Sequence, residues 1–301
     1  MQVAPWDLLR ESSRSTLALV TTPASPTVLR KRLGMLLREA RVRRGLNQDD
    51  VATALEVDRT TIGRIENGQA KVKVLVLKAW LNVLDIHDPE LCQELEQLAR
   101  DADKAGWWTG QAGSIRSSYA TYVGFESGAV EVLDFQTVVV PGLLQTEAYA
   151  TALFSTVVPG LSGEDIAARV QVRLKRQERV EDATLRVTVV IDESVLYRTI
   201  GGFDVWRGQM QRLATLAARP NVRMQILPYD TPAHPGALGS FVVLRFDNDP
   251  MIAYIESAAG DLFLDGQPAQ NYSATFNALA VAALPAEMSR KRILEVLDQR
   301  G

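Results

Sequence analysis

Cysteine and histidine are scarce in this sequence, which has one cysteine, Cys92, and two histidines among 301 residues. One cysteine excludes an internal disulfide, and no Cys/His spacing is typical of a structural zinc site. We therefore predict no metal and no cofactor. A reducing, cytoplasmic location is the expectation that this cysteine usage favours.

Long apolar runs are also lacking. No stretch reaches the roughly 18 apolar residues of a membrane-spanning helix, and the apolar patch at Leu17–Val20 is shorter than a signal-peptide core. We expect no membrane contact. Residues 1–27 are rich in Ser, Thr and Pro without a sustained period, which predicts a flexible tail.

Charge is distributed unevenly along the chain. Residues 28–87 contain twelve Lys and Arg against seven Asp and Glu, a net charge of +5, although the whole chain carries −3. The remainder is therefore acidic, at −8. A basic segment attached to an acidic body favours local binding of phosphate groups rather than coating of nucleic acid by the whole surface.

Periodicity and capping residues predict a helix-turn-helix in this basic segment. Gly45 suits the left-handed residue that ends a first helix, while Asn47 and Asp58 are favourable N-caps for a second and a third. The predicted helices are Val28–Arg44, Gln48–Leu55, a third from Asp58 to Asn67-Gly68, and Val74–Leu84.

The motifs G-L-N-Q at residues 45–48 and I-x-x-I-E-N-G at residues 62–68 carry a resemblance. With their spacing, the segment resembles the Xre/Cro-type phage-repressor helix-turn-helix family over about sixty residues. The resemblance implies a buried ion pair between Arg41 and Glu66. It also implies DNA contacts, which we assign to Asn47 and Gln48 at phosphates, Arg59, Thr60, Thr61 and Arg64 on the recognition helix, and Lys71 and Lys73 in the following loop.

General physical chemistry supports the same interpretation. An arginine bonds guanine O6 and N7 together, and helix amino termini present free N–H groups to phosphates. The alternative is an ordinary four-helix cluster with a solvated basic face. Because capping, turn spacing and an Arg/Glu pair coincide, the sequence favours binding to double-stranded DNA.

Residues 88–118 are predicted as a connecting helix and linker. The helix starts at Asp88-Pro89, and Cys92 falls on its apolar face as a small core residue. Trp107-Trp108 and a Gly/Ser stretch follow.

Residues 119–301 alternate helical and strand patterns, which predicts an α+β, or mixed α/β, domain after the all-α domain of four to five helices. The predicted helices are Tyr119–Leu133, Leu143–Phe154, one from Ser162, Phe203–Ala218, Pro268–Ala283 and Pro285–Gln299. The predicted strands are Leu185–Ile191, Val222–Leu227, Ser240–Phe246 and Met251–Ile255.

This second region resembles the uncharacterised carboxy-terminal domain of many actinobacterial Xre-type regulators, often labelled antitoxin-like. The motifs that carry the resemblance are Val140–Ala150, Arg173–Gln177, Val190–Leu196, Ile226–Pro228, His234–Gly236, Gly239–Phe241 and Ala253–Glu256. The resemblance implies a regulator that is commonly encoded near a small partner protein.

Candidate ligand or partner residues in this region are Asp192, Glu193, His234 and Glu256. No nucleophile elbow, phosphate loop or metalloprotease motif accompanies them, so we predict a protein that is not an enzyme. The arginines 169, 173 and 176 form a stripe at helical spacing, for which anion binding and a solvated face paired with nearby acids are alternatives; the solvated face is favoured.

Three functional hypotheses follow. The first is a cytoplasmic, nucleoid-associated transcription regulator, a homodimer controlled through its carboxy-terminal domain by a small-molecule effector or a partner protein. The second is an antitoxin-like protein that binds a small partner protein and autoregulates its operon. The third, a DNA-tethered enzyme, is the weakest because no catalytic constellation appears.

Overall fold

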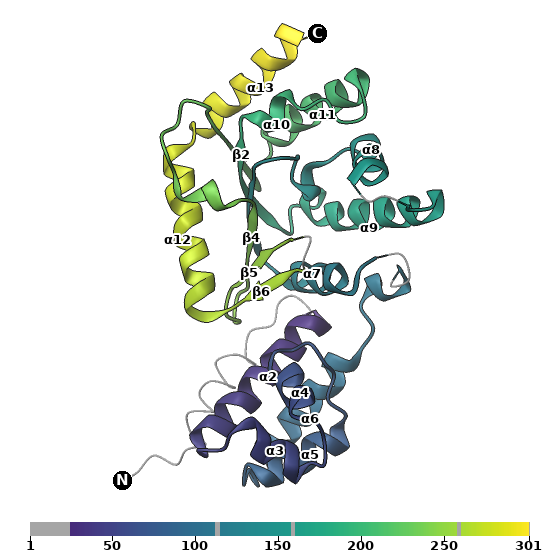
Figure 1. Cartoon of the computed structure of the whole chain (residues 1–301), viewed down its shortest axis with the longest axis vertical. Helices are drawn as coiled ribbons and strands as arrows, with labels where there is room; N and C mark the ends of the chain where they lie inside the picture. The colour runs from purple at the N-terminus through teal and green to yellow at the C-terminus, as the bar shows by residue number, and fades with distance from the viewer. Residues whose placement is uncertain (1–24, 112–114, 158–159, 258–259, 301) are drawn as a thin grey trace. The chain divides into compact units, whose positions relative to one another are not determined.

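The structure is a computed structural model that describes residues 25–111, 115–157, 160–257 and 260–300. The chain divides into two compact units, Met1–Thr109 and Gly110–Gly301 (Figure 1). The tail predicted for residues 1–27 lies outside the described residues except for its last three positions. Those belong to the first helix, because the Ser25 hydroxyl accepts a hydrogen bond from Thr27 N at 3.3 Å and caps it.

The first unit is a cluster of helices around one apolar core. Its helices are α2 (Pro26–Arg43), α3 (Gln48–Ala54), α4 (Arg59–Glu66), α5 (Val74–Val83) and α6 (Pro89–Asp103), followed by the 3-10 turn η1 (Trp107–Gln111). Leu37, Val51, Ile62 and Trp80 are buried in the core, and Cys92 packs at its edge. The predicted all-α domain is thus confirmed.

Two backbone positions let α2, α3 and α4 pack closely. A Cβ on Gly34 would lie 2.3 Å from the Ile65 carbonyl oxygen, so only glycine permits this approach of α2 to α4. Glu56 has a φ of 53° in the turn between α3 and α4, the left-handed conformation in which glycine is usual. A non-glycine residue there costs about 1 kcal/mol.

The second unit is built on one six-stranded mixed sheet of order β3-β2-β1-β4-β5-β6. Its strands are β1 (Glu131–Gln136), β2 (Arg186–Asp192), β3 (Val222–Leu227), β4 (Phe241–Arg245), β5 (Ile252–Ile255) and β6 (Leu262–Leu264). Strands β1, β2 and β3 are parallel, and β4 to β6 are antiparallel to their neighbours. The predicted mixed α/β domain is confirmed.

Helices cover both faces of the sheet (Figure 1). On one side lies α12 (Gly266–Ala282), and on the other lie α7 (Ser117–Gly128), α8 (Glu147–Val157), α9 (Gly163–Glu181), α10 (Ser194–Tyr197) and α11 (Phe203–Leu216). Helix α13 (Ala286–Arg300) packs against the edge strand β3 and against α11. Two 3-10 turns, η2 (Gly142–Leu144) and η3 (Pro235–Leu238), complete the described elements.

Strand β1 corrects the sequence-based assignment. A helix was predicted over Tyr119–Leu133, but α7 ends at Gly128 and a strand begins at Glu131. This strand is central, pairing with β2 and β4, so both of its faces are buried and the alternation that marks a half-exposed strand is missing. The short strand β6 was also missed.

Asp134 lies in the middle of β1 and is only 4% exposed. Burial raises the pKa of its carboxyl group to about 7, against the opposing effect of a hydrogen bond from Gln136 Nε2 at 2.8 Å. The sheet therefore contains an acid that is costly to ionise.

We predict that Asp134→Asn stabilises the protein at high pH. Between the ordinary pKa of 3.8 and about 7, the folded carboxyl holds its proton while the unfolded one ionises, so the wild-type free energy of unfolding falls as pH rises. Asparagine does not titrate in this range. The free energy of unfolding of Asp134→Asn therefore exceeds that of the wild type by an amount that grows through this window toward about 4 kcal/mol and stays constant at higher pH.

Urea unfolding of both proteins at pH 5 and pH 8 measures the effect. Asp204→Asn, at an exposed aspartate of α11, is the matched control and should show no such pH dependence. If Asp134→Asn changes the free energy of unfolding equally at both pH values, the raised pKa of the Asp134 carboxyl group is contradicted.

Candidate nucleic-acid interface

Helix α3 starts with a capping box. The Asn47 side chain accepts hydrogen bonds from Asp49 N at 2.7 Å and Asp50 N at 3.0 Å, while Asp50 Oδ2 accepts from Asn47 N at 2.7 Å. These contacts fix where α3 begins. Asp58 occupies the N-cap of α4 as predicted, but its side chain makes no capping hydrogen bond.

Helix α4 separates an apolar face from a polar one. Ile62 and Ile65 are buried in the core, whereas Arg59, Thr60 and Arg64 are exposed. Thr61, also predicted to contact DNA, is half-buried at the border of the two faces. Thr60 and Arg64, four residues apart, share one side of the helix.

Two of the predicted contacts are engaged within the protein. Gln48 Nε2 donates to Glu66 Oε2 at 2.8 Å, so this side chain links α3 to α4. Arg59 Nε lies 3.6 Å from Asp49 Oδ2 in an ion pair whose side chains are both about two-thirds exposed, and such pairs contribute little and break easily.

The two lysines after α4 differ. Lys71 Nζ lies 2.8 Å from Asp103 Oδ1 and donates to the Asp103 carbonyl at 2.7 Å, and this contact lowers the pKa of the Asp103 carboxyl. Lys73 is the exposed N-cap residue of α5. Lys73 is therefore better placed than Lys71 to receive a phosphate.

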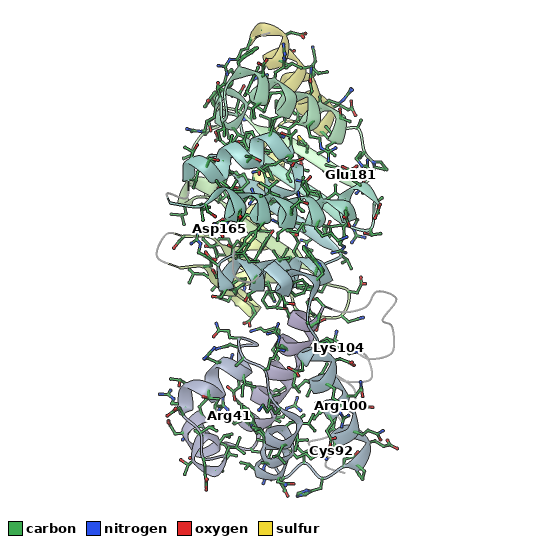
Figure 2. The ribbon with its side chains drawn as sticks, turned by 90° about the vertical axis from the view of Figure 1, so that its right-hand side faces the viewer. Arg41, Cys92, Arg100, Lys104, Asp165 and Glu181 are labelled. Carbon is green, nitrogen blue, oxygen red and sulfur yellow. The ribbon has the colours of Figure 1, made fainter. Side chains whose placement is uncertain are left out.

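A buried ion pair joins α2 to α4. Arg41 Nε and Nη2 donate to Glu66 Oε1 at 2.6 Å and Oε2 at 2.9 Å, and Arg41 Nη1 donates to the Leu46 carbonyl at 2.8 Å (Arg41 is labelled in Figure 2). Both side chains are less than a tenth exposed. Because Glu66 also accepts from Gln48, one carboxylate connects three helices.

The four candidate residues of the second unit are not brought together into one site. Glu193 pairs with Arg292 of α13 and accepts from Tyr229 N at 3.0 Å, and the adjacent Asp192 accepts from Ser194 N at 2.9 Å. The His234 ring lies edge-on to Phe135, with centroids 6.4 Å apart. Glu256 lines a cavity that the other three do not line.

Comparison with protein families assigns the second unit. The family described as a domain of unknown function (DUF5753) matches residues 119–295, more than half of the chain. The chain belongs to the DUF5753 family. A helix-turn-helix family matches residues 37–91, which indicates DNA binding by the first unit. Searches of curated proteins and of solved structures gave no match.

The arginine stripe of the DUF5753 domain was interpreted wrongly from sequence. Arg173 and Arg176 of α9 are buried, and Arg176 forms an ion pair with Glu126 of α7, with Nε 2.6 Å from Oε1. The acids expected to pair with the stripe bind other cations: Glu178 pairs with Lys175 and Glu181 with arginines 212 and 219. Arg173 and Arg176 therefore face the interior of the domain, and Arg169 is partly exposed.

The described residues hold neither a candidate membrane span nor a candidate metal cluster. None of their helices is long and apolar enough to cross a membrane. The same residues contain no group of three or more His, Cys, Asp or Glu side chains placed to hold a metal ion.

We predict that Arg41→Ala destabilises the helix-turn-helix by about 3–5 kcal/mol, because it leaves the buried Glu66 carboxylate without its counter-charge. Thermal unfolding of the full chain, followed by circular dichroism, measures this. Arg43→Ala is the matched control: Arg43 pairs with Glu39 on the exposed side of the same helix, so the loss should stay near 0.5 kcal/mol. Equal losses of stability in the two variants would show that the buried Arg41–Glu66 pair does not stabilise the packing of α2 against α4.

Proposed function

We propose that this protein is a sequence-specific DNA-binding transcription regulator that acts as a dimer and is controlled through its DUF5753 domain. The observation that carries the proposal is the division of α4, in which Ile62 and Ile65 fix the helix while Arg59, Thr60 and Arg64 stay exposed. The helix-turn-helix match supports DNA binding.

The exposed face of α4 suits the major groove. Arginine presents a planar fork that bonds guanine O6 and N7 at the same time, and threonine contacts bases through its hydroxyl or methyl group. The Asp49 contact of Arg59 is exposed and weak, so a guanine edge would compete with it effectively.

Contacts with the DNA phosphates would set the position of α4 in the groove. The amino terminus of α3 carries the positive end of a helix dipole, and the exposed Lys73 follows α4 in the chain. These groups would bind phosphates, which position a protein on DNA without reading sequence.

A dimer is proposed because one helix-turn-helix reads few base pairs. Two copies would read half-sites about one helical turn, roughly 34 Å, apart. For control of DNA binding, a cavity in the DUF5753 domain favours a small-molecule effector over a partner protein.

We predict that Arg59→Ala and Arg64→Ala each reduce the preference for specific over random duplex by roughly tenfold to hundredfold, because each removes a base contact worth about 1–3 kcal/mol. Lys73→Ala should instead weaken binding to both duplexes equally and flatten the salt dependence. Gel shifts at several salt concentrations distinguish the two behaviours.

The matched control is Arg207→Ala, which removes one exposed arginine from α11 of the other unit. Circular dichroism checks that the variants keep the wild-type fold. Unchanged selectivity in folded Arg59→Ala and Arg64→Ala would refute the assignment of α4 as the reading helix.

A further inference from the structure

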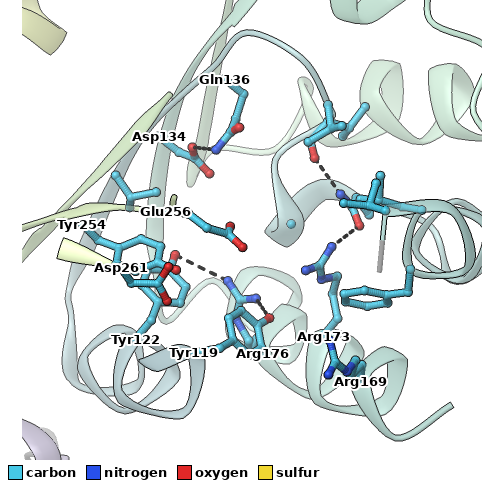
Figure 3. Close-up of a pocket in the computed structure, with 18 of the residues that line it drawn as sticks. Tyr119, Tyr122, Asp134, Gln136, Arg169, Arg173, Arg176, Tyr254, Glu256 and Asp261 are labelled. Carbon is cyan, nitrogen blue, oxygen red and sulfur yellow. Dashed lines mark hydrogen bonds between the residues drawn. The ribbon is translucent and has the colours of Figure 1, made fainter. Parts of the chain in front are cut away.

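A cavity of about 370 Å³ lies in the DUF5753 domain between α7, α8, α9, η2 and one face of the sheet (Figure 3). Its volume is in the range of small-molecule binding sites. Its walls combine aromatic and aliphatic side chains with a few charged groups.

Arg173 is the most unusual group in this cavity. The residue is only 9% exposed, and its guanidinium carbon lies 4.5 Å from the centroid of the Phe154 ring. Gly142 also lies close to this side chain, because a Cβ there would be 3.5 Å from Arg173 Nε. The guanidinium thus contacts both an aromatic ring and a glycine, which restricts its movement.

The hydrogen bonds of Arg173 are incomplete. Nη1 donates to Gln145 Oε1 at 2.6 Å, and Gln145 is itself oriented because its Nε2 donates to the Val140 carbonyl at 2.7 Å. The Nε atom is buried and has no hydrogen-bond partner. Across the residues that the structure describes, no carboxylate lies within 4.0 Å of this guanidinium.

Arg176, one turn along α9, shows what Arg173 lacks. Arg176 is also buried, but the Glu126 carboxylate binds it through Nε at 2.6 Å and Nη2 at 2.5 Å. A buried cation without a counter-ion is unfavourable. Because Arg173 is fixed and unpaired while its neighbour is neutralised, an anionic ligand group would supply the missing charge.

The other charged groups limit how negative that ligand is. Asp134 reaches the cavity from β1, and Glu256, 3.7 Å from Arg116, reaches it from the end of β5. The Glu256 carboxylate would repel a dianion such as phosphate. The buried Asp134 keeps an acceptor oxygen for a ligand N–H or O–H whether or not its carboxyl group is ionised. A monoanion that carries a hydrogen-bond donor would suit both Arg173 and Asp134.

Aromatic side chains define the shape of the remaining surface. The rings of Tyr122 and Tyr254 have centroids 4.4 Å apart, and Tyr119 stacks on Tyr122 at 6.1 Å. With Phe154 these rings line the cavity. Such a surface favours a flat, ring-containing molecule.

We propose that this cavity binds a small aromatic monocarboxylate, with its carboxylate on the guanidinium of Arg173 and a hydrogen-bond donor facing Asp134. The effector role of this ligand rests on the function proposed above. Binding of the ligand to the cavity is tested separately, without DNA.

Isothermal titration of the full-length protein with three related probes tests the ligand class. Indole-3-propionate has the carboxylate, the ring and an N–H donor; 3-(1-naphthyl)propionate lacks the donor; tryptamine replaces the carboxylate with an ammonium group. We expect indole-3-propionate to bind most tightly, the naphthyl acid less tightly and tryptamine at least tenfold more weakly than indole-3-propionate.

Variants test the contributions of Arg173 and Asp134 separately. Arg173→Gln should weaken indole-3-propionate binding by roughly tenfold to hundredfold, because it removes a charge-assisted contact. Lys175→Gln loses the same charge from the exposed side of α9 and should bind like wild type. Asp134→Ala should abolish the preference for the indole acid over the naphthyl acid.

Removing an unpaired buried cation should not lower the melting temperature, so Arg173→Gln is expected to stay folded. The proposal is overturned if neither acid binds at millimolar concentration, if tryptamine binds as well as the acids, or if Lys175→Gln loses as much affinity as Arg173→Gln. Arg59→Ala should keep full affinity for indole-3-propionate while losing operator selectivity, so the two proposals fail independently.

Discussion

Burial of arginine is the constraint on which both units of this protein depend. A guanidinium taken out of water requires a carboxylate and a full set of acceptors, and breaking such a pair is strongly destabilising. In the first unit Arg41 and Glu66 meet this requirement and tie α2 to α4. In the second, Arg176 and Glu126 do so and tie α9 to α7.

These pairs position the parts of the molecule to which we assign function. The Arg41–Glu66 pair holds the end of α4 against α2, while Gln48 adds α3 to the same carboxylate, so the exposed face of α4 has a fixed direction. The Arg176–Glu126 pair ties together α9 and α7, two of the helices around the DUF5753 cavity, and Arg176 itself lines that cavity. Arg173, on the same helix as Arg176, is fixed but unpaired, which is why we infer that its counter-charge arrives with a ligand.

The first unit could be predicted closely because its signals are local. Asn47, Gly45 and Asp58 mark helix ends within a few residues of the apolar positions that they serve, and the predicted helix bounds differ from the observed ones by one or two residues where both are defined. The Asp58 side chain shows the limit, since a residue in an N-cap position need not use its side chain as a cap.

The second unit was harder to predict because its important features depend on distant partners. Strand β1 joins β2 and β4, which lie about fifty and a hundred residues further along the chain, and its buried faces hide the strand period. The role of Arg176 likewise depends on Glu126 in α7, so the arginine stripe resembled a solvated face. The motif segments Val140–Ala150 and Arg173–Gln177 contribute side chains to the cavity wall, but composition alone could not show which of these side chains were buried.

Selection of random-sequence duplexes by the full-length protein, followed by sequencing of the bound fraction, tests the central claim most directly. The account predicts an enriched motif of two related half-sites whose centres are about one helical turn, roughly 10 base pairs, apart. The same selection with Arg59→Ala and Arg64→Ala combined should return no motif. Enrichment of no sequence by the wild-type protein, or of the same motif by the double variant, would contradict a sequence-specific regulator that reads DNA through α4.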